Sequence, residues 1–327
     1  MVAAAAIVIV KQVTKDPLEL DAVPLAVLPA DGTRAEYGLG ELGGRAVFIK
    51  TQDSITVHDA ETGRPLGKPY GTVDKARYPH GDGVAVAEAG GRPLLLLLHD
   101  GKLVIRDLNA GTNATSPIPI EGISGRLFVT RDGSGRPLVV TRGDADLVTV
   151  NLETYQVTKH PFGDLVTGLS VGWLDRRAVA AVTLSHGTRR VVDVATGADV
   201  FPATRGSAAR IGGHVAMAEV GDRTYLVAGG GDEWRGWVVD GGNAGSTEYR
   251  FHRMLSFDAL RLGAVRGRGV AVASGTSGRI VWSLPDAKEM TVPGIAPKLE
   301  VGDAAMVRGR FYVVTSEPYQ ARVWVLE

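Results

Sequence analysis

The chain contains no cysteine among its 327 residues. This absence excludes a disulfide framework, catalysis by a thiolate and zinc binding through cysteine ligands. A reducing compartment suits a chain of this kind, so we expect the protein to be cytoplasmic.

An excess of charge of either sign is also missing. Lys plus Arg total 36 and Asp plus Glu total 36, so the formal net charge is zero. No overall field therefore favours a polyanion, and we expect neither nucleic acid nor a membrane as a partner. The apolar segment Met1–Val10 is too short to span a bilayer and has no basic stretch before it, so we interpret it as a strand.

Aromatic residues make up 6% of the chain and charged residues 22%, whereas glycine occurs 43 times and hydrophobic residues reach 44%. This balance is typical of many short strands joined by tight turns, and it does not favour helices or disorder.

A strand followed by a turn recurs seven times. The residues that close the strand are Asp59, Asp107, Asn151, Asp193, Asp240, Ser283 and, in the last copy, Val325. Successive positions are 48, 44, 42, 47, 43 and 42 residues apart. Such a period indicates the four-stranded blades of a propeller.

An arginine marks the same register in every copy, 14 to 17 residues before the closing position. These arginines are Arg45, Arg92, Arg136, Arg177, Arg223, Arg268 and Arg310. The interval holds two strands and a hairpin turn. Glu41, Glu88 and Glu219 each precede their arginine by four residues, which predicts ion pairs across the hairpins rather than a basic ring for an anion.

We therefore predict an all-β fold, a single seven-bladed β-propeller over residues 1–327 with four-stranded antiparallel blades. Inner strands such as Val84–Glu88 are rich in small residues, as a crowded axis requires. The chain ends after the third strand of the seventh copy, so we expect the N-terminal segment Ile7–Val13 to complete that blade and close the ring.

Several segments resemble WD40 repeats. Asp100–Asp107 (DGKLVIRD) is similar to the family's turn and third strand, while Ile280–Ser283 (IVWS) and Val323–Val325 (VWV) place tryptophan where the family has its WD tryptophan. Gly213-His214 lies 25 residues before Val239-Asp240, similar to the family's GH and WD landmarks. The resemblance implies a propeller of degenerate bacterial WD40-like repeats and no specific activity, since this fold hosts many functions.

Two short motifs match catalytic or nucleotide-binding patterns. Gly38–Gly43 matches GxGxxG and Gly168–Gly172 matches the GxSxG nucleophile elbow around Ser170. Both patterns need a helix after a strand. The repeat register places both in inner strands instead, so we expect neither a dinucleotide site nor an exposed catalytic serine.

Intervals longer than the repeat requires are the natural places for a binding surface. The surplus residues lie in Thr72–Gly83 and around Glu233, and the segment Tyr249–Phe257 is unusually aromatic and basic. Trp, Tyr and Arg in such segments are typical of protein interfaces. The candidate binding residues are Arg77, Tyr78, His80, Trp234, Arg235, Tyr249, His252 and Arg253.

Two functions remain open from the sequence. The first is a non-catalytic scaffold that docks a protein or peptide on the loop face of the propeller. The alternative is an enzyme of the lyase, cyclase or hydrolase type that binds a small molecule in the central funnel. Its candidate catalytic residues are His99, Arg142, Asp144, His186 and Glu233. The histidine spacing matches no ligand motif, so we expect no metal and no other cofactor.

Overall fold

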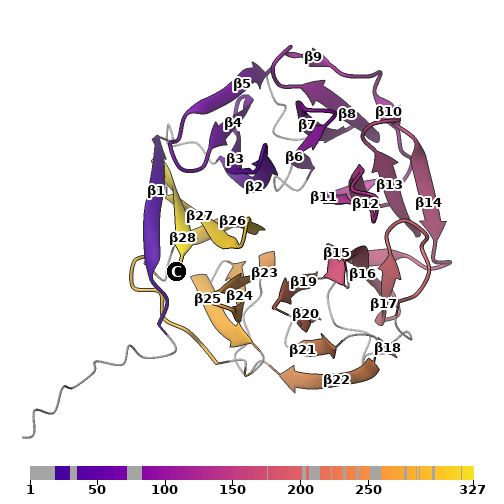
Figure 1. The fold of residues 1–327 in the computed structure, drawn as a ribbon, viewed down its shortest axis with the longest axis vertical. Helices are drawn as coiled ribbons and strands as arrows, with labels where there is room; N and C mark the ends of the chain where they lie inside the picture. The colour runs from indigo at the N-terminus through magenta and orange to yellow at the C-terminus, as the bar shows by residue number, and fades with distance from the viewer. Residues whose placement is uncertain are drawn as a thin grey trace, which may run out of the picture.

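The computed structural model describes residues 19–29, 35–71, 83–174, 176–200, 204–205, 214–221, 223–230, 233–240, 243–250, 259–275, 278–284, 286, 288–296, 299–317 and 319–327. Their strands form seven sheets around one axis, which confirms the seven-bladed propeller (Figure 1). Within these ranges, no helix is long and apolar enough to cross a membrane.

Each blade is an antiparallel sheet whose first strand lies nearest the axis (Figure 1). Blade one comprises β2 (Glu36–Leu42), β3 (Arg45–Thr51), β4 (Ile55–Asp59) and β5 (Pro65–Tyr70). Blade two comprises β6 (Val84–Ala89), β7 (Arg92–His99), β8 (Lys102–Asp107) and the short β9 (Thr112–Asn113) and β10 (Ile118–Pro119). Blade three comprises β11 (Ser124–Arg131), β12 (Pro137–Arg142), β13 (Asp146–Asn151) and β14 (Val157–Pro161).

The remaining blades follow in chain order. Blade four comprises β15 (Val166–Leu174), β16 (Arg177–Leu184), β17 (Thr188–Asp193) and β18 (Thr204–Arg205). Blade five comprises β19 (His214–Val220), β20 (Arg223–Gly230), β21 (Glu233–Asp240) and β22 (Asn243–Arg250). Blade six comprises β23 (Ala259–Val265), β24 (Arg268–Gly275) and β25 (Gly278–Leu284). Blade seven comprises β26 (Glu300–Val307), β27 (Arg310–Glu317), β28 (Gln320–Leu326) and β1 (Ala22–Pro29).

Both repeat markers occupy equivalent places in the structure. The arginine is the first residue of the second strand in six blades, and Arg136 directly precedes β12 in blade three. The closing residue is the last of the third strand in five blades, and Ser283 and Val325 are the last but one in blades six and seven. The predicted register of the repeat is therefore confirmed.

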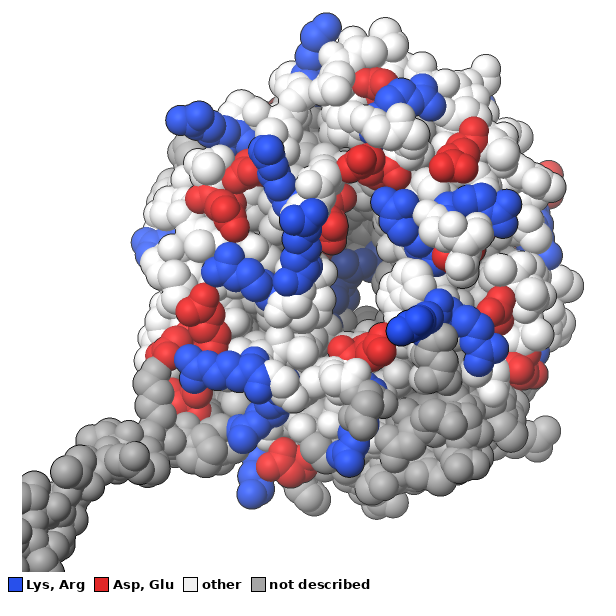
Figure 2. Space-filling model, in the orientation of Figure 1, with Lys and Arg blue, Asp and Glu red and all other residues white. Residues whose placement is uncertain are grey.

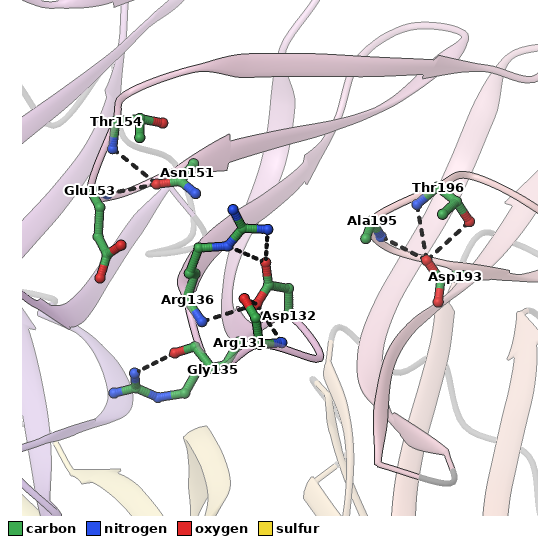
Figure 3. Close-up of polar contacts among 11 residues, drawn as sticks. Arg131, Asp132, Gly135, Arg136, Asn151, Glu153, Thr154, Asp193, Ala195 and Thr196 are labelled. Carbon is green, nitrogen blue, oxygen red and sulfur yellow. Dashed lines mark hydrogen bonds and ion pairs between the residues drawn. The ribbon is translucent and has the colours of Figure 1, made fainter.

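The closing residue recurs because its side chain holds the turn that follows (Figure 3). Asn151 Oδ1 accepts hydrogen bonds from the backbone N–H groups of Glu153 (2.8 Å) and Thr154 (2.9 Å). Asp193 Oδ1 accepts from Ala195 (3.0 Å) and Thr196 (2.9 Å), and Asp59 and Asp107 form the same turn. A short side chain with an acceptor oxygen satisfies turn N–H groups that the strands leave unpaired.

Hydrophobic cores lie between neighbouring blades. In β7, Leu95 and Leu97 pack with residues of blade one, while Leu94 and Leu96 pack with residues of blade three. Both faces of the strand are buried, which explains why its sequence is a continuous apolar run rather than an alternating one. Gly40 of the GxGxxG motif has a packing role, because a Cβ there would lie 2.5 Å from Val86. Ser170 of the GxSxG motif lies within β15 and is 6% exposed, as the repeat register predicted.

The ring is closed by the N-terminal strand, but by a different segment from the one predicted. β1 (Ala22–Pro29) pairs antiparallel with β28, from Ala22 opposite Leu326 to Pro29 opposite Gln320. The predicted segment Ile7–Val13 lies outside the described residues. In β1, Ala26 and Leu28 are buried and Val27 between them is 55% exposed, the alternation of an outer strand. The strand also contains two prolines, which an edge strand tolerates because proline has no N–H to donate.

Residues just before β1 join the last two blades. Leu20 N donates to Thr291 O (3.0 Å) beside blade six. Asp21 and Glu327 of blade seven exchange backbone hydrogen bonds of 3.1 and 3.0 Å. Met290 N in turn donates to Val281 O of β25 (2.7 Å). The segment around Met290 therefore lies beside β25, where the other blades have a fourth strand.

Candidate functional site

The two faces of the propeller differ in the turns that form them. Strand direction alternates within a blade, so turns between second and third strands emerge with the connections between blades. We call this side the loop face; its described members include residues 52–54, 100–101, 120–123, 143–145, 162–165 and 185–187. We call the other side, with the turns between first and second strands, the hairpin face.

A buried charge cluster crosses the axis. Asp303 on β26 is 3% exposed, and its two oxygens each lie 3.1 Å from Nη2 of Arg126 on β11. Arg261 on β23 donates from Nε to Oδ1 (2.6 Å), and Leu39 N of β2 donates to Oδ2 (2.9 Å). The cluster therefore joins inner strands of blades three, six, seven and one. Figure 2 shows an opening at the axis with basic side chains inside it.

Bulges in two inner strands aim the partners of this cluster. The pairing of β11 with β12 shifts between Ser124 and Phe128, and Arg126 lies within that shift. The pairing of β26 with β27 shifts between Val301 and Asp303. A bulge turns a side chain out of the regular alternation of a strand, and bulges of this kind are frequent beside functional sites. Both ends of the cross-axis contact thus depend on local departures from regular pairing.

The chemistry available to this cluster is electrostatic rather than acid–base. The Asp303 carboxylate accepts hydrogen bonds from Arg126, Arg261 and Leu39 N, so its oxygens are engaged. Nη1 of Arg126 is buried and has no hydrogen-bond partner among the described residues. Two guanidinium groups face one carboxylate, which leaves the cluster with an excess positive charge.

The sequence analysis missed these three residues, although a signal was present. Arg126, Arg261 and Asp303 are charged residues in the interior of inner strands, where charges otherwise occur only at or next to strand ends, as at Arg131 and Glu300. A charge at such a position is expected only where a partner across the axis compensates it.

The five funnel candidates do not lie in the inner strands. His99 ends β7, Arg142 ends β12, Glu233 begins β21, and Asp144 and His186 lie in turns between second and third strands. All five are on the loop face, in blades two to five, one strand or more away from the strands that line the axis. Arg142 Nη1 donates to Val166 O of β15 (2.9 Å), a contact that ties blade three to blade four.

His186 belongs to a surface group with Asp164 and Ser185. Asp164 Oδ2 lies 2.7 Å from His186 Nδ1, and Ser185 Oγ donates to Asp164 Oδ1 (2.6 Å). Ser185 Oγ also lies 3.3 Å from the same His186 Nδ1. A catalytic triad needs the serine and the aspartate on opposite nitrogens of the ring, so this geometry is not a triad. The hydrogen bonds from Ser185 and His186 lower the pKa of Asp164 to about 2.

The group fixes an exposed leucine. Leu165 N donates to Asp164 Oδ1 (2.7 Å), and Leu165 O accepts from Ser185 N (2.8 Å). The Leu165 side chain is nevertheless 51% exposed. Tyr319, in the turn between β27 and β28, is 74% exposed on the same face. The loop face therefore presents large apolar side chains, one of them on a backbone held at both its N–H and its carbonyl.

The predicted surface residues have different outcomes. Arg77, Tyr78, His80, His252 and Arg253 lie outside the described residues. Trp234 and Arg235 lie in β21 and Tyr249 lies in β22, so the expectation of an enlarged loop around Glu233 is wrong. The longer interval is taken up by β20 and β21, which are eight residues each and are joined through residues 231–232.

The predicted ion pairs across the hairpins are also wrong for the three glutamates. Glu41 is opposite Ala46, whereas Arg45 is opposite Leu42. Successive residues of a strand point to opposite faces, so Glu41 and Arg45 lie on different sides of the sheet. Glu88 with Arg92 and Glu219 with Arg223 have the same register.

A narrow gap lies between blades six and seven and has no room for a water molecule. Its lining is aliphatic: Val272, Val281, Val292, Ile295, Val313 and Leu326. It offers a polar ligand no hydrogen-bonding group. In the described part of the chain, no group of three or more His, Asp or Glu side chains is placed to hold a metal ion.

Comparison with known proteins identifies solved structures that share this fold. The chain is similar in structure to BBS1N. In the crystal of BBS1N in complex with ARL6DN soaked with mercury, the match has a TM-score of 0.63 and 11% identity over 94% of this chain and 98% of that chain. In the crystal soaked with lead, the values are 0.65 and 10% over 94% and 97%. At this identity the likeness shows the fold alone. No protein-family model and no curated protein matches the sequence.

Proposed function

We propose that the protein is a non-catalytic scaffold whose loop face binds a protein or peptide partner. The observation that supports this most directly is the exposure of Leu165 on a backbone fixed by Asp164 and Ser185. An apolar side chain on a backbone that is already ordered requires little further backbone ordering on binding, which favours it as an interface anchor.

Other features of the loop face support the same proposal. Tyr319 adds an exposed aromatic side chain in blade seven. Tyrosine and arginine are enriched at the energetic centres of interfaces. We propose that the sequence candidates of the connections between blades, Arg77, Tyr78, His80, His252 and Arg253, take part in the same surface, together with Trp234, Arg235 and Tyr249 at the ends of their strands.

The alternative of an enzyme in the funnel has less support. A general acid or base must have a titratable group free to meet a substrate. Asp303, the carboxylate of the axial cluster, is engaged by two arginines, and the funnel candidates lie at the loop-face ends of the second and third strands of four blades. The aliphatic gap between blades six and seven has no group for catalysis.

The likeness to BBS1N is compatible with a binding role. That propeller is described in complex with ARL6DN. We also propose that the repeats are of the WD40 type. Trp282 and Trp324 lie in the third strands of blades six and seven and are 3% and 5% exposed, where the family's tryptophan is expected. As further proposals, residues 1–327 form one domain and the protein acts in the cytoplasm.

A matched pair of surface changes tests the scaffold. The protein and two variants are purified with their bound proteins from the cells that make them, and the bound proteins are quantified by mass spectrometry. Leu165→Ser with Tyr319→Ser should lose a partner that the unchanged protein retains at a fixed ratio. Val27→Ser is the control, because Val27 is 55% exposed on β1, outside the loop face. Equal thermal unfolding of all three excludes a folding defect. Retention of the same proteins by the unchanged protein and by both variants would refute the proposal.

A further inference from the structure

One level of the axis carries two charged side chains among small residues. Arg261 on β23 is opposite Val272, and Asp303 on β26 is opposite Val314, each four residues after the arginine of its repeat. The equivalent positions of blades one to five are Gly38, Ala85, Phe128, Ser170 and Ala216. Apart from Phe128 these are small residues, which leave space around the charged pair. Figure 2 shows that the axis is open and has basic side chains inside it.

Both arginines of the axial cluster are already held in place by the protein. Arg126 donates from Nη2 to both oxygens of Asp303, and its guanidinium carbon lies 5.4 Å from the centre of the Phe128 ring. Arg261 donates from Nε to Asp303 and from Nη1 to the backbone O of Leu260 (2.9 Å). A binding group that is ordered beforehand loses little conformational freedom when a ligand arrives. The cluster is therefore preorganised for binding.

Each of these arginines has a nitrogen that remains available to a ligand. Within the described part of the chain, Nε of Arg126 and Nη2 of Arg261 make no hydrogen bond, and neither nitrogen is fully buried. The two side chains are 23% and 22% exposed, whereas that of Asp303 is 4% exposed. Neighbouring blades cover both faces of an inner strand and the second strand covers one edge, so this exposed area faces the axis. The accessible part of the cluster is therefore positive.

We propose that Arg126 and Arg261 bind a small oxyanion at the axis, a molecule that carries a phosphate or carboxylate group. The fork of a guanidinium group matches two oxygens of such a group, and a partly buried site strengthens the attraction. Asp303 neutralises only one of the two arginines, and the chain as a whole has no net charge. A small anion therefore suits the cluster better than a polyanion does. This site is separate from the loop face, so its failure leaves the scaffold proposal standing.

Isothermal titration calorimetry with sodium phosphate, and separately with sodium acetate, tests the proposal at fixed ionic strength. The unchanged protein should bind at least one of these anions saturably, and the tighter of the two shows which group the site prefers. Arg126→Gln and Arg261→Gln should each raise the Kd about tenfold or more, because a hydrogen bond between charged groups is lost. Arg64→Gln is the control, an exposed arginine in the turn between β4 and β5, and should leave the Kd unchanged.

A further variant retains both arginines and distinguishes binding from folding. Asp303→Asn removes the carboxylate that competes with the ligand for the two guanidinium groups. It should therefore bind the anion more tightly, and the anion should raise its melting temperature by more than that of the unchanged protein. A cluster that serves only the fold predicts no such difference. The proposal is overturned if neither anion binds the unchanged protein saturably, if both arginine variants bind as tightly as it does, or if Asp303→Asn binds no more tightly.

Discussion

Arg126 on β11 donates from Nη2 to both carboxylate oxygens of Asp303 on β26, at 3.1 Å, although the two residues are 177 positions apart in the chain. Their blades, three and seven, are not neighbours in the ring (Figure 1). The hydrophobic cores join adjacent blades only two at a time, for instance blades two and three. The cross-axis contact therefore adds a link that the cores do not provide.

Removal of the charge of Asp303 should destabilise the ring. Asp303→Asn leaves Arg126 and Arg261 without their counter-ion in a site where the carboxylate is 4% exposed. Breaking one partner of a buried pair costs about 3 kcal/mol or more. Glu61→Gln is the control, because its pair with Arg310 joins side chains that are 59% and 46% exposed. It should cost less than about 1 kcal/mol. Urea unfolding measures both, and equal losses would contradict the role given to Asp303.

Closure of the ring by β1 predicts that substitutions at two neighbouring residues of this strand change the free energy of unfolding by different amounts. Leu28 is 8% exposed and packs in the core shared by blades seven and one, whereas Val27 is 55% exposed. Leu28→Ala should lower the free energy of unfolding by about 2–3 kcal/mol. Val27→Ala should change it by no more than about 0.5 kcal/mol. Similar effects of the two substitutions in thermal unfolding would mean that β1 is oriented differently.

Alanine substitutions at two turn glycines allow the cost of backbone strain to be measured apart from the cost of a steric clash. Gly63 and Gly197 both have φ of +71°, so alanine at either position should cost about 1 kcal/mol. A Cβ at Gly197 would also lie 2.5 Å from Nδ1 and 2.8 Å from Cβ of His160, while the nearest atom at Gly63 is 3.6 Å away. Gly197→Ala should therefore cost about 1–3 kcal/mol more than Gly63→Ala. Chemical denaturation tests this, and a difference of zero would refute the predicted collision.

Asp132 predicts an acid-dependent contribution to stability. Burial disfavours its charge, but hydrogen bonds from Ser134 and Arg136 outweigh this and lower its pKa from 3.8 to about 2 (Figure 3). Since the folded pKa is the lower one, the carboxylate stabilises the fold above pH 3.8, and this contribution is lost as the pH falls towards 2. Melting temperatures of Asp132→Asn and the unchanged protein should differ at neutral pH and converge near pH 2. A difference that persists at that pH would contradict this account.

Periodic features made the architecture predictable. The closing residues and the arginines mark strand ends, and the same local chemistry, such as the turn held by Asn151 or Asp193, recurs in each copy. The closing strand was harder to assign. Ile7–Val13 has the stronger hydrophobic pattern, but the segment that pairs with β28 is Ala22–Pro29, which contains two prolines, residues that are uncommon within strands.

Features that depend on distant contacts were not predictable from the repeat. Arg126 and Asp303 meet through two bulges that no short pattern announces. The spacing of four residues predicted ion pairs of Glu41 with Arg45 and of Glu88 with Arg92. Spacing along the chain does not show to which face of the sheet each side chain points, and the register places the partners on opposite faces. Leu165 carries no motif; its importance follows from exposure and from the hydrogen bonds around it.

The most direct measurement of the scaffold proposal is site-specific photo-crosslinking in the cells that make the protein. A photoreactive phenylalanine replaces Leu165 in one variant and Val27 in another, since both side chains are about equally exposed, at 51% and 55%. The scaffold predicts one discrete adduct with another protein from position 165 and none from position 27. Identical adducts from both positions, or no adduct from position 165, would contradict a binding surface on the loop face.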